Sequence, residues 1–316
     1  MRIGYFLSCE EFGPADLVEQ AKLAEAAGFE ALWISDHYHP WNDNQGQSPF
    51  VWGVIGAISQ VCRLPVGTAV TAPTVRLHPA VVAQAAATAA VQLGGRFTLG
   101  VGTGEALNEH ILGDAWPSEP VRLQMLEEAV EVMRALWSGD FTYHRGTHYT
   151  VENARIYTRL DTPPPVFVSA FGDRSFDLAL RIGDGFITTS PEAEQVSAWH
   201  QKAGDKPAQA GYKVCVADTE DEGVRIAHRL WANAGVPGEL AQVLPSPKHF
   251  EQASELVTEQ MTRESTTCGR DVEAHAAAFQ PYAEAGFDDV FIANMGPHYR
   301  DFFDLYRDEV LPRLRR

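Results

Sequence analysis

The sequence predicts an α/β protein, a (β/α)8 TIM barrel with insertions that forms one domain over residues 1–316. Apolar runs of strand length alternate with segments of helical period, and about eight strands can be counted. No Gly-x-Gly-x-x-Gly pattern follows the first strand, where an open doubly wound sheet that binds a dinucleotide would carry one. The length would also allow two domains, but single barrels with insertions reach it as well.

The first half of the chain supplies four strand–helix units. Strands are expected at residues 3–7, 31–35, 64–71 and 97–101, and helices at 15–27, 51–61, 80–93 and 121–137. Gly28 is expected to end the first helix, because glycine adopts the left-handed conformation that closes a helix. Such alternation favours parallel strands joined by right-handed crossovers.

The second half contains two interruptions. Aromatic and polar residues alternate around Arg145-Gly146, which predicts a hairpin-like insertion near residues 141–160. A Pro-rich stretch at 236–247 predicts a second insertion near 236–262. The remaining strands are expected at 166–170, 185–189, 214–217 and 288–293, and the remaining helices at 175–182, 220–233, 249–261 and 298–314.

Composition and charge restrict the class of partner. With 25 Lys and Arg against 42 Asp and Glu, the net charge is −17, so binding to nucleic acid or to an anionic membrane surface is disfavoured. No apolar stretch approaches the length of a membrane span, and the first residues lack the apolar run of a secretory signal. We therefore expect a cytoplasmic protein that binds neither nucleic acid nor a membrane.

Cysteine usage fits the same compartment. Cys9, Cys62, Cys215 and Cys268 are far apart and have neither zinc-ligand nor disulfide spacing. We expect buried, inert thiols and no metal site. Cys9 is the one thiol near a predicted strand end.

In barrels of this class the active site lies where the strands end and the following loops begin. Asp36, His37 and Trp41 follow the second strand, and a histidine beside a carboxylate is a common proton shuttle. The alternative is that Asp36 and His37 only satisfy loop backbone groups. Gly102-Thr103-Gly104-Glu105 and Asn108 follow the fourth strand, where glycines allow close approach to a flat ligand or simply form a tight turn.

Two further strand ends carry candidate residues. Residues 68–74 crowd small and β-branched side chains into a turn, which is equally well explained as a plain strand end. Phe171, Gly172, Arg174 and Ser175 open a predicted helix, where free N–H groups and the helix dipole can bind an anion.

These motifs carry a resemblance. Asp36-His37 with Trp41, the run from Gly102 to Glu109, and the run from Arg181 to Phe186 resemble the luciferase-like superfamily. Within it they resemble the branch that uses the deazaflavin coenzyme F420, typified by F420-dependent glucose-6-phosphate dehydrogenases. The similarity covers nearly the whole chain and is weakest between about residues 195 and 270.

The resemblance implies roles for matching positions. His37 would be the general acid/base facing the deazaflavin ring, Glu105 would exchange a proton with a ring nitrogen, and Trp41 would cover the charge that develops during hydride transfer. Ala69-Val70 falls where the family has a non-prolyl cis peptide behind the ring. Further cofactor contacts are implied for Asp36, Ala69, Val70, Ala72, Thr103, Gly104, Asn108, Phe171, Gly172, Arg174 and Ser175. A homodimer is also implied.

The expected substrate site departs from the family pattern. The sugar-phosphate dehydrogenases hold phosphate with a Thr, two Lys and an Arg. Thr189 matches the Thr, but Glu192 occupies the first Lys position, and Ala241 and Glu264 align with the other two. Since a carboxylate repels a phosphate dianion, we predict a non-phosphorylated substrate that contacts Trp41, Thr189 and Glu192.

The sequence therefore predicts an F420-dependent oxidoreductase that reduces C=C, C=N or C=O groups or oxidises an alcohol. Three alternatives remain open at this stage: an F420-dependent sugar-6-phosphate dehydrogenase, an FMN-dependent luciferase-like monooxygenase, and a cofactor-binding protein without catalysis.

Overall fold

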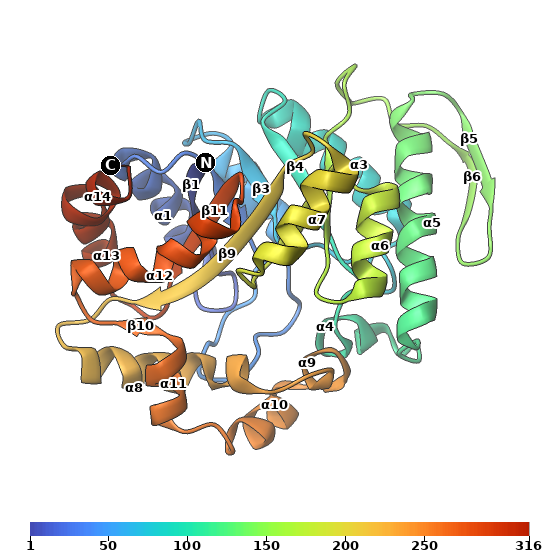
Figure 1. Ribbon diagram of the computed structural model, residues 1–316. Coiled ribbons are helices and arrows are strands. Elements are labelled where there is room, and N and C mark those ends of the chain that lie inside the picture. The colour runs from blue at the N-terminus through green and yellow to red at the C-terminus, as the bar shows by residue number, and fades with distance from the viewer. Residues whose placement is uncertain (316) are drawn as a thin grey trace.

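The computed structural model describes residues 1–315 and contains a closed barrel of eight parallel strands surrounded by helices (Figure 1). The barrel strands, in chain order, are β1 (Arg2–Leu7), β2 (Leu32–Ile34), β3 (Val66–Thr68), β4 (Phe97–Val101), β7 (Val166–Ser169), β8 (Gly185–Thr188), β9 (Ala208–Cys215) and β11 (Asp289–Asn294). β9 pairs with both β11 and β8, which closes the ring. The predicted (β/α)8 fold is confirmed.

Helices cover the outside of the barrel and cap its carboxyl end. In chain order they are α1 (Pro14–Ala27), α2 (Val51–Ile58), α3 (Pro79–Gln92), α4 (Ala106–Glu109), α5 (Glu119–Trp137), α6 (Asp173–Ile182), α7 (Ala193–Ala203), α8 (Glu220–Trp231), α9 (Leu240–Val243), α10 (Pro247–Ser254), α11 (Glu259–Ser265), α12 (Val272–Ala285), α13 (Tyr299–Leu305) and α14 (Leu311–Leu314). As expected, Gly28 caps α1 in the left-handed conformation, with φ 92°.

The two expected insertions have different structures. The first contains an antiparallel pair, β5 (Thr142–Arg145) and β6 (Thr150–Ala154), which lies outside α5 (Figure 1). The second contains α9, α10 and α11, which lie with α8 and α4 at the bottom of the view, below the strands (Figure 1). The prediction of a single helix at 249–261 is wrong. α10 ends at Ser254, and a second helix, α11, follows it. Thr258 caps α11 by accepting a hydrogen bond from the Met261 N–H.

Several elements differ from the sequence prediction. β9 begins at Ala208 rather than at residue 214, and α7 and α12 occupy segments where no helix was expected. The early part of β9 reads Ala-Gln-Ala-Gly-Tyr, which has little of the β-branched character that marks a strand. A short strand, β10 (Thr267–Cys268), adds to β9 beyond the end of β8.

The barrel lumen is filled by aromatic rings and by the small residues that make room for them. Trp33 stacks on Phe291 with ring centroids 4.2 Å apart. A Cβ atom at Gly211 would lie 2.5 Å from the Trp33 ring, and one at Gly4 would lie 2.3 Å from the Phe291 ring. Since this packing closes the lumen, ligands have access only at the strand ends.

A polar chain crosses the lumen beside these rings. The Trp33 indole N–H donates to Gln209, Gln209 donates to Asp289, and Asp289 accepts two hydrogen bonds from Arg2. These contacts join β2, β9, β11 and β1, which are far apart in the sequence.

No helix among residues 1–315 has the length and apolar character needed to cross a membrane. The expected homodimer and cytoplasmic location stay predictions.

Gly100 of β4 offers a sharp test of this packing. A Cβ atom there would lie 1.9 Å from the backbone oxygen of Thr68, which cannot move without breaking the barrel. We expect Gly100→Ala to lower the free energy of unfolding by about 3 kcal/mol or more, measured by chemical denaturation. The matched control is Gly53→Ala on α2, where nothing lies within 4 Å of the added atom. That variant should be neutral or more stable by up to about 1 kcal/mol, and equal losses in both variants would contradict the packing argument.

Candidate active site

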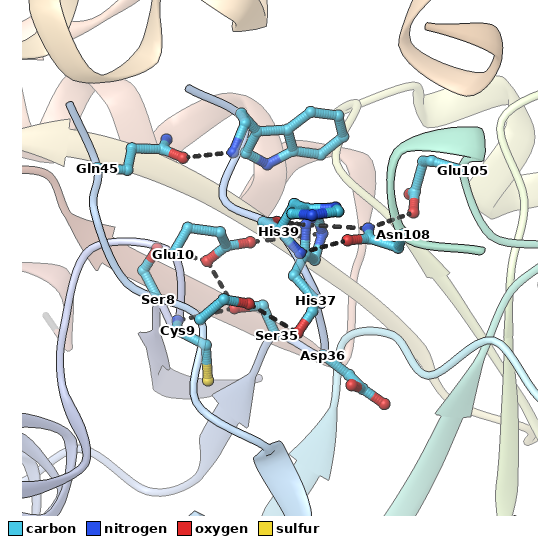
Figure 2. A network of polar contacts seen from close by, with 12 residues as sticks. Ser8, Cys9, Glu10, Ser35, Asp36, His37, His39, Gln45, Glu105 and Asn108 are labelled. Atoms are coloured by element: carbon cyan, nitrogen blue, oxygen red, sulfur yellow. Dashed lines mark hydrogen bonds and ion pairs between the residues drawn. The ribbon is translucent and has the colours of Figure 1, made fainter. Parts of the chain in front are cut away.

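Residues that follow β1, β2 and β4 meet at the carboxyl end of the barrel (Figure 2). His37 lies at the centre of this group. Its Nδ1 atom is 3.1 Å from the Asn108 amide nitrogen and 3.2 Å from the His39 carbonyl oxygen. Its Nε2 atom has no hydrogen-bond partner among residues 1–315, and the Glu10 carboxylate faces it at 3.5 Å. Nε2 is therefore the nitrogen that is available to exchange a proton with a bound molecule.

Asn108 fixes the orientation of this histidine. Its side-chain oxygen accepts hydrogen bonds from the Tyr38 and His39 N–H groups at 2.9 and 3.1 Å. The amide nitrogen is therefore a donor, and at 3.3 Å it reaches the Glu105 carboxylate (Figure 2). It also lies 3.1 Å from His37 Nδ1, to which it donates only while Nδ1 carries no proton; a protonated Nδ1 donates to the His39 carbonyl instead. Asn108 thus connects the loop after β2 with α4 and brings Glu105 to the same side as His37.

Glu10 is a buried carboxylate that the sequence analysis did not single out. One of its oxygens accepts hydrogen bonds from Ser8 at 2.8 Å and Ser35 at 2.7 Å. Burial acts to raise the pKa of Glu10, but the charge of His37, the Ser35 hydrogen bond and the charge of Lys213 outweigh it, so the pKa is lowered. The Glu10 carboxylate is therefore a negative charge that faces His37 Nε2. Its position directly after the first strand was the signal that could have identified it.

Trp41 covers the histidine. The centroids of the His37 and Trp41 rings are 4.9 Å apart. The indole also packs edge-to-face on Phe250 of α10, with ring centroids 5.0 Å apart. The backbone N–H of Trp41 donates to the Gln45 side chain, which in turn donates to the Leu230 carbonyl at the end of α8. The second insertion therefore holds the indole in place.

Asp36 lies away from the histidine, in a buried ion cluster. Its carboxylate accepts from the Thr71 hydroxyl at 2.8 Å and from Arg76 at 2.9 Å. Arg76 also contacts Glu109, whose carboxylate accepts the Arg76 backbone N–H at 2.7 Å. Both carboxylates are 1% exposed. In this arrangement Asp36 positions its neighbours, and the contact with a cofactor implied for it stays a prediction.

A cavity of about 360 Å³ adjoins Glu105 and contains much of the expected cofactor site. Predicted residues that line it are Val70, Thr103, Gly104, Glu105, Phe171, Gly172 and Ser175. The Ala69-Val70 peptide is cis, as the resemblance implied. Ala69 packs on the lumen core, and Ala72 is a buried wall residue against Gly104.

The shape and donors of this cavity suit a flat ligand with an anionic end. Gly104 has φ 80° and leaves no room for a side chain, because a Cβ atom would lie 2.9 Å from Glu109. Around Gly172, by contrast, nothing lies within 4 Å of an added Cβ, so the start of α6 is open. Backbone N–H groups of the first turn of α6 can bind an anion there. Arg174 is exposed and pairs with Glu119 at 3.0 Å, so it lies at the rim.

A second cavity, of about 1070 Å³, opens along the edge of β9. β8 ends at Thr188, whereas β9 continues to Cys215, so the gap between β8 and β10 exposes the middle of β9. Thr189, Lys213 and Glu264 line this cavity, whereas Glu192 is an exposed residue at the start of α7 and does not. Of the residues expected to contact substrate, Thr189 alone is shown at this cavity. Lys213 was missed, because its segment was not recognised as a strand.

The four cysteines are buried and free, as expected. Burial, together with the nearby charges of Glu10 and Asp36, raises the pKa of the Cys9 thiol well above its ordinary value. Its sulfur points away from Glu10 and His37 (Figure 2). Cys9 is therefore an inert packing residue rather than a nucleophile.

Comparisons with known proteins fit this geometry. A family model described as luciferase-like monooxygenase matches residues 1–289. An F420-dependent glucose-6-phosphate dehydrogenase of Kribbella flavida is 36% identical, covering 100% of this chain and 99% of that protein. One of Nakamurella multipartita is 35% identical, with 100% and 97% covered.

Solved structures give the same result. An F420-dependent secondary alcohol dehydrogenase in complex with an F420–acetone adduct superposes with a TM-score of 0.90 and 32% identity, covering 100% of this chain and 99% of that chain. The F420-dependent tetrahydromethanopterin reductase of Methanopyrus kandleri superposes with a TM-score of 0.76 at 20% identity, covering 99% of each chain, which shows the shared fold.

The Asp36–Arg76–Glu109 cluster predicts a pH dependence of stability. Burial raises the pKa of Glu109 from 4.5 to about 7, although Arg76 opposes the shift. Between these values the folded protein binds more protons than the unfolded chain, so stability falls as pH rises from about 4.5 to 7. Glu109→Gln should remove the contribution of Glu109 to this decrease in the free energy of unfolding, which is up to about 3 kcal/mol. The measurement is a set of unfolding curves from pH 5 to 8. Exposed Glu131→Gln is the control, and an unchanged pH profile for Glu109→Gln would contradict the assignment.

Proposed function

The chain belongs to the luciferase-like family, and from this premise we propose that it transfers a hydride between coenzyme F420 and an organic substrate that carries no phosphate. It is an oxidoreductase that uses F420, the cofactor for which its full-length relatives are named. The proposal rests on two features at the barrel mouth. One is a glycine-walled cavity that ends at Glu105. The other is His37, whose Nε2 faces the Glu10 carboxylate at 3.5 Å and has no hydrogen-bond partner among residues 1–315.

The residues of the 360 Å³ cavity fit this cofactor. Gly104 and the Ala69-Val70 peptide provide flat backbone walls, and the open first turn of α6 provides N–H donors for an anionic tail. When bound, the cofactor supplies a carbon centre that accepts or releases a hydride. Glu105 would hold a proton at the edge of the bound ring, with its carboxylate oriented by the Asn108 amide.

The chain's own residues handle the substrate proton. His37 Nε2 takes the hydroxyl proton when an alcohol is oxidised, or gives a proton to the carbonyl oxygen when a ketone is reduced. Glu10 stabilises the protonated imidazole, because its carboxylate lies 3.5 Å from Nε2 and has a lowered pKa. Trp41, held by Phe250 and Gln45, keeps water away from this proton transfer.

The charge of the second cavity supports a substrate without phosphate. Its acidic lining residues are Asp218, Glu220, Glu264 and Asp271, and its basic ones are Lys213, Arg263 and Arg270. Arg263 is already paired with Glu220 at 2.5 Å and with Asp221 at 2.6 Å. A phosphate dianion would have to compete with these carboxylates and face unpaired acids beside them.

The role of His37 is tested by His37→Ala. We expect kcat to fall by about 10²–10⁴-fold, because the proton transfer loses its acid/base group. The affinity for F420 should stay within threefold of wild type in a fluorescence titration, while turnover is followed by the absorbance change of the cofactor. His200→Ala on α7 is the control. A His37→Ala enzyme within threefold of wild-type kcat would remove His37 from the mechanism, and an enzyme that binds FMN but not F420 would refute the cofactor.

The absence of a phosphate site is tested with matched sugars. Glucose 6-phosphate should reduce F420 no faster than glucose, and inorganic phosphate should not compete with an accepted alcohol. The physical reason is the acidic lining described above. A KM for glucose 6-phosphate at least tenfold below that for glucose would show that the cavity does bind the phosphate.

A further inference from the structure

We propose that Lys213 binds a second oxygen of the substrate, so that this enzyme acts on diols and hydroxyketones rather than on simple alcohols and ketones. The inference rests on the proposed function, since it concerns the substrate of the same site. It is carried by the position of one side chain whose charged end has no hydrogen-bond or ion-pair partner among residues 1–315.

Lys213 points toward the barrel lumen. It follows Gln209 and Gly211 at alternate positions of β9, and both of these residues contact Trp33 inside the barrel. The ammonium group lies above the carboxyl end of the aromatic packing, 4.3 Å from the centre of the Trp231 ring and 5.3 Å from that of Phe6. Lys213 also lines the 1070 Å³ cavity.

The ammonium group has no hydrogen-bond or ion-pair partner among residues 1–315. An ammonium in a partly buried position without acceptors is unfavourable, and aromatic contacts replace only a part of its lost hydration. Burial indeed lowers the pKa of Lys213, although the charges of Glu10 and Glu11 oppose this shift. The three N–H donors are therefore available to an acceptor that enters the cavity.

Two carboxylates near Lys213 define which acceptor fits. Glu10 contributes a negative charge that is felt by both Lys213 and His37. Glu11 accepts hydrogen bonds from the Trp231 indole and the Gly296 N–H, and burial raises its pKa to about 7. A substrate carboxylate or phosphate would add a further negative charge beside these groups. A neutral hydroxyl or carbonyl oxygen accepts from Lys213 without that repulsion.

The charge of Glu10 thus acts on two groups with different tasks. His37 exchanges the proton of the oxygen on the reacting carbon, and Lys213 donates to another oxygen of the same molecule. For a diol, the reacting carbon gives its hydride to F420, the hydroxyl on that carbon gives its proton to His37 Nε2, and a carbonyl forms. The second hydroxyl keeps its bonds throughout and only orients the substrate.

The experiment compares 2-butanol with 2,3-butanediol and 1,3-butanediol, which share a carbon skeleton and differ in the second hydroxyl. Binding is measured first by saturation-transfer NMR on the protein without cofactor, and turnover is then measured with F420. Wild type should favour at least one diol over 2-butanol by tenfold or more. In Lys213→Met this preference should fall at least tenfold, through KM rather than kcat, with unchanged affinity for F420.

Two further variants complete the test. Lys202→Met is the matched control, because Lys202 also lies over an aromatic ring, Phe176 at 5.9 Å, but is exposed on α7. It should behave as wild type. Lys213→Arg keeps the charge and the donors and should retain part of the preference if Lys213→Met is poorly folded. Equal binding of diols and 2-butanol by wild type, or an unchanged preference in Lys213→Met, would overturn the inference. Failure of wild type to bind F420 would instead refute the proposed function, while the NMR comparison would still test the Lys213 site.

Discussion

Buried carboxylates at the mouth of this barrel require hydrogen-bond donors and positive charges, and this requirement determines how the surrounding loops are arranged. Glu10, Asp36 and Glu109 are all buried, and ionised carboxylates removed from water are costly unless charges and hydrogen bonds compensate them. Ser8, Ser35 and His37 compensate Glu10, and Arg76 lies between the other two. These carboxylates and their partners follow β1, β2, β3 and β4, so their pairing fixes four separate segments relative to one another.

The aromatic packing below this layer explains why the chemistry is confined to one end. Trp33 and Phe291 fill the lumen. The rings fit because Gly4 and Gly211 have no Cβ atom, which would clash with them. A polar ligand therefore cannot enter from below. His37 and Glu10 follow the ends of β2 and β1, at the carboxyl end of the barrel, and Lys213 lies near the end of β9, where it lines the second cavity.

The net charge of −17 acquires a more specific meaning in the structure. Negative charge is abundant around the second cavity, whereas the positive groups near the mouth are few and mostly paired. An anionic cofactor tail must therefore rely on local N–H groups at the start of α6 rather than on the overall field. The same distribution favours a neutral, oxygen-rich substrate over a phosphorylated one.

The sequence by itself determined the barrel, most of its helices and the strand ends that carry His37, Trp41, Glu105 and Asn108. These are properties of local period and of position relative to a strand end, so they can be read over a few residues. The sequence did not reveal the start of β9, because Ala, Gln and Gly have little strand preference, and with it Lys213 was lost. Only the tertiary structure decided that Asp36 faces Arg76, that Glu192 lies outside the second cavity, and that Glu10 contacts His37. The physical reason is that burial and charge pairing depend on which distant strands become neighbours, and no local pattern records that.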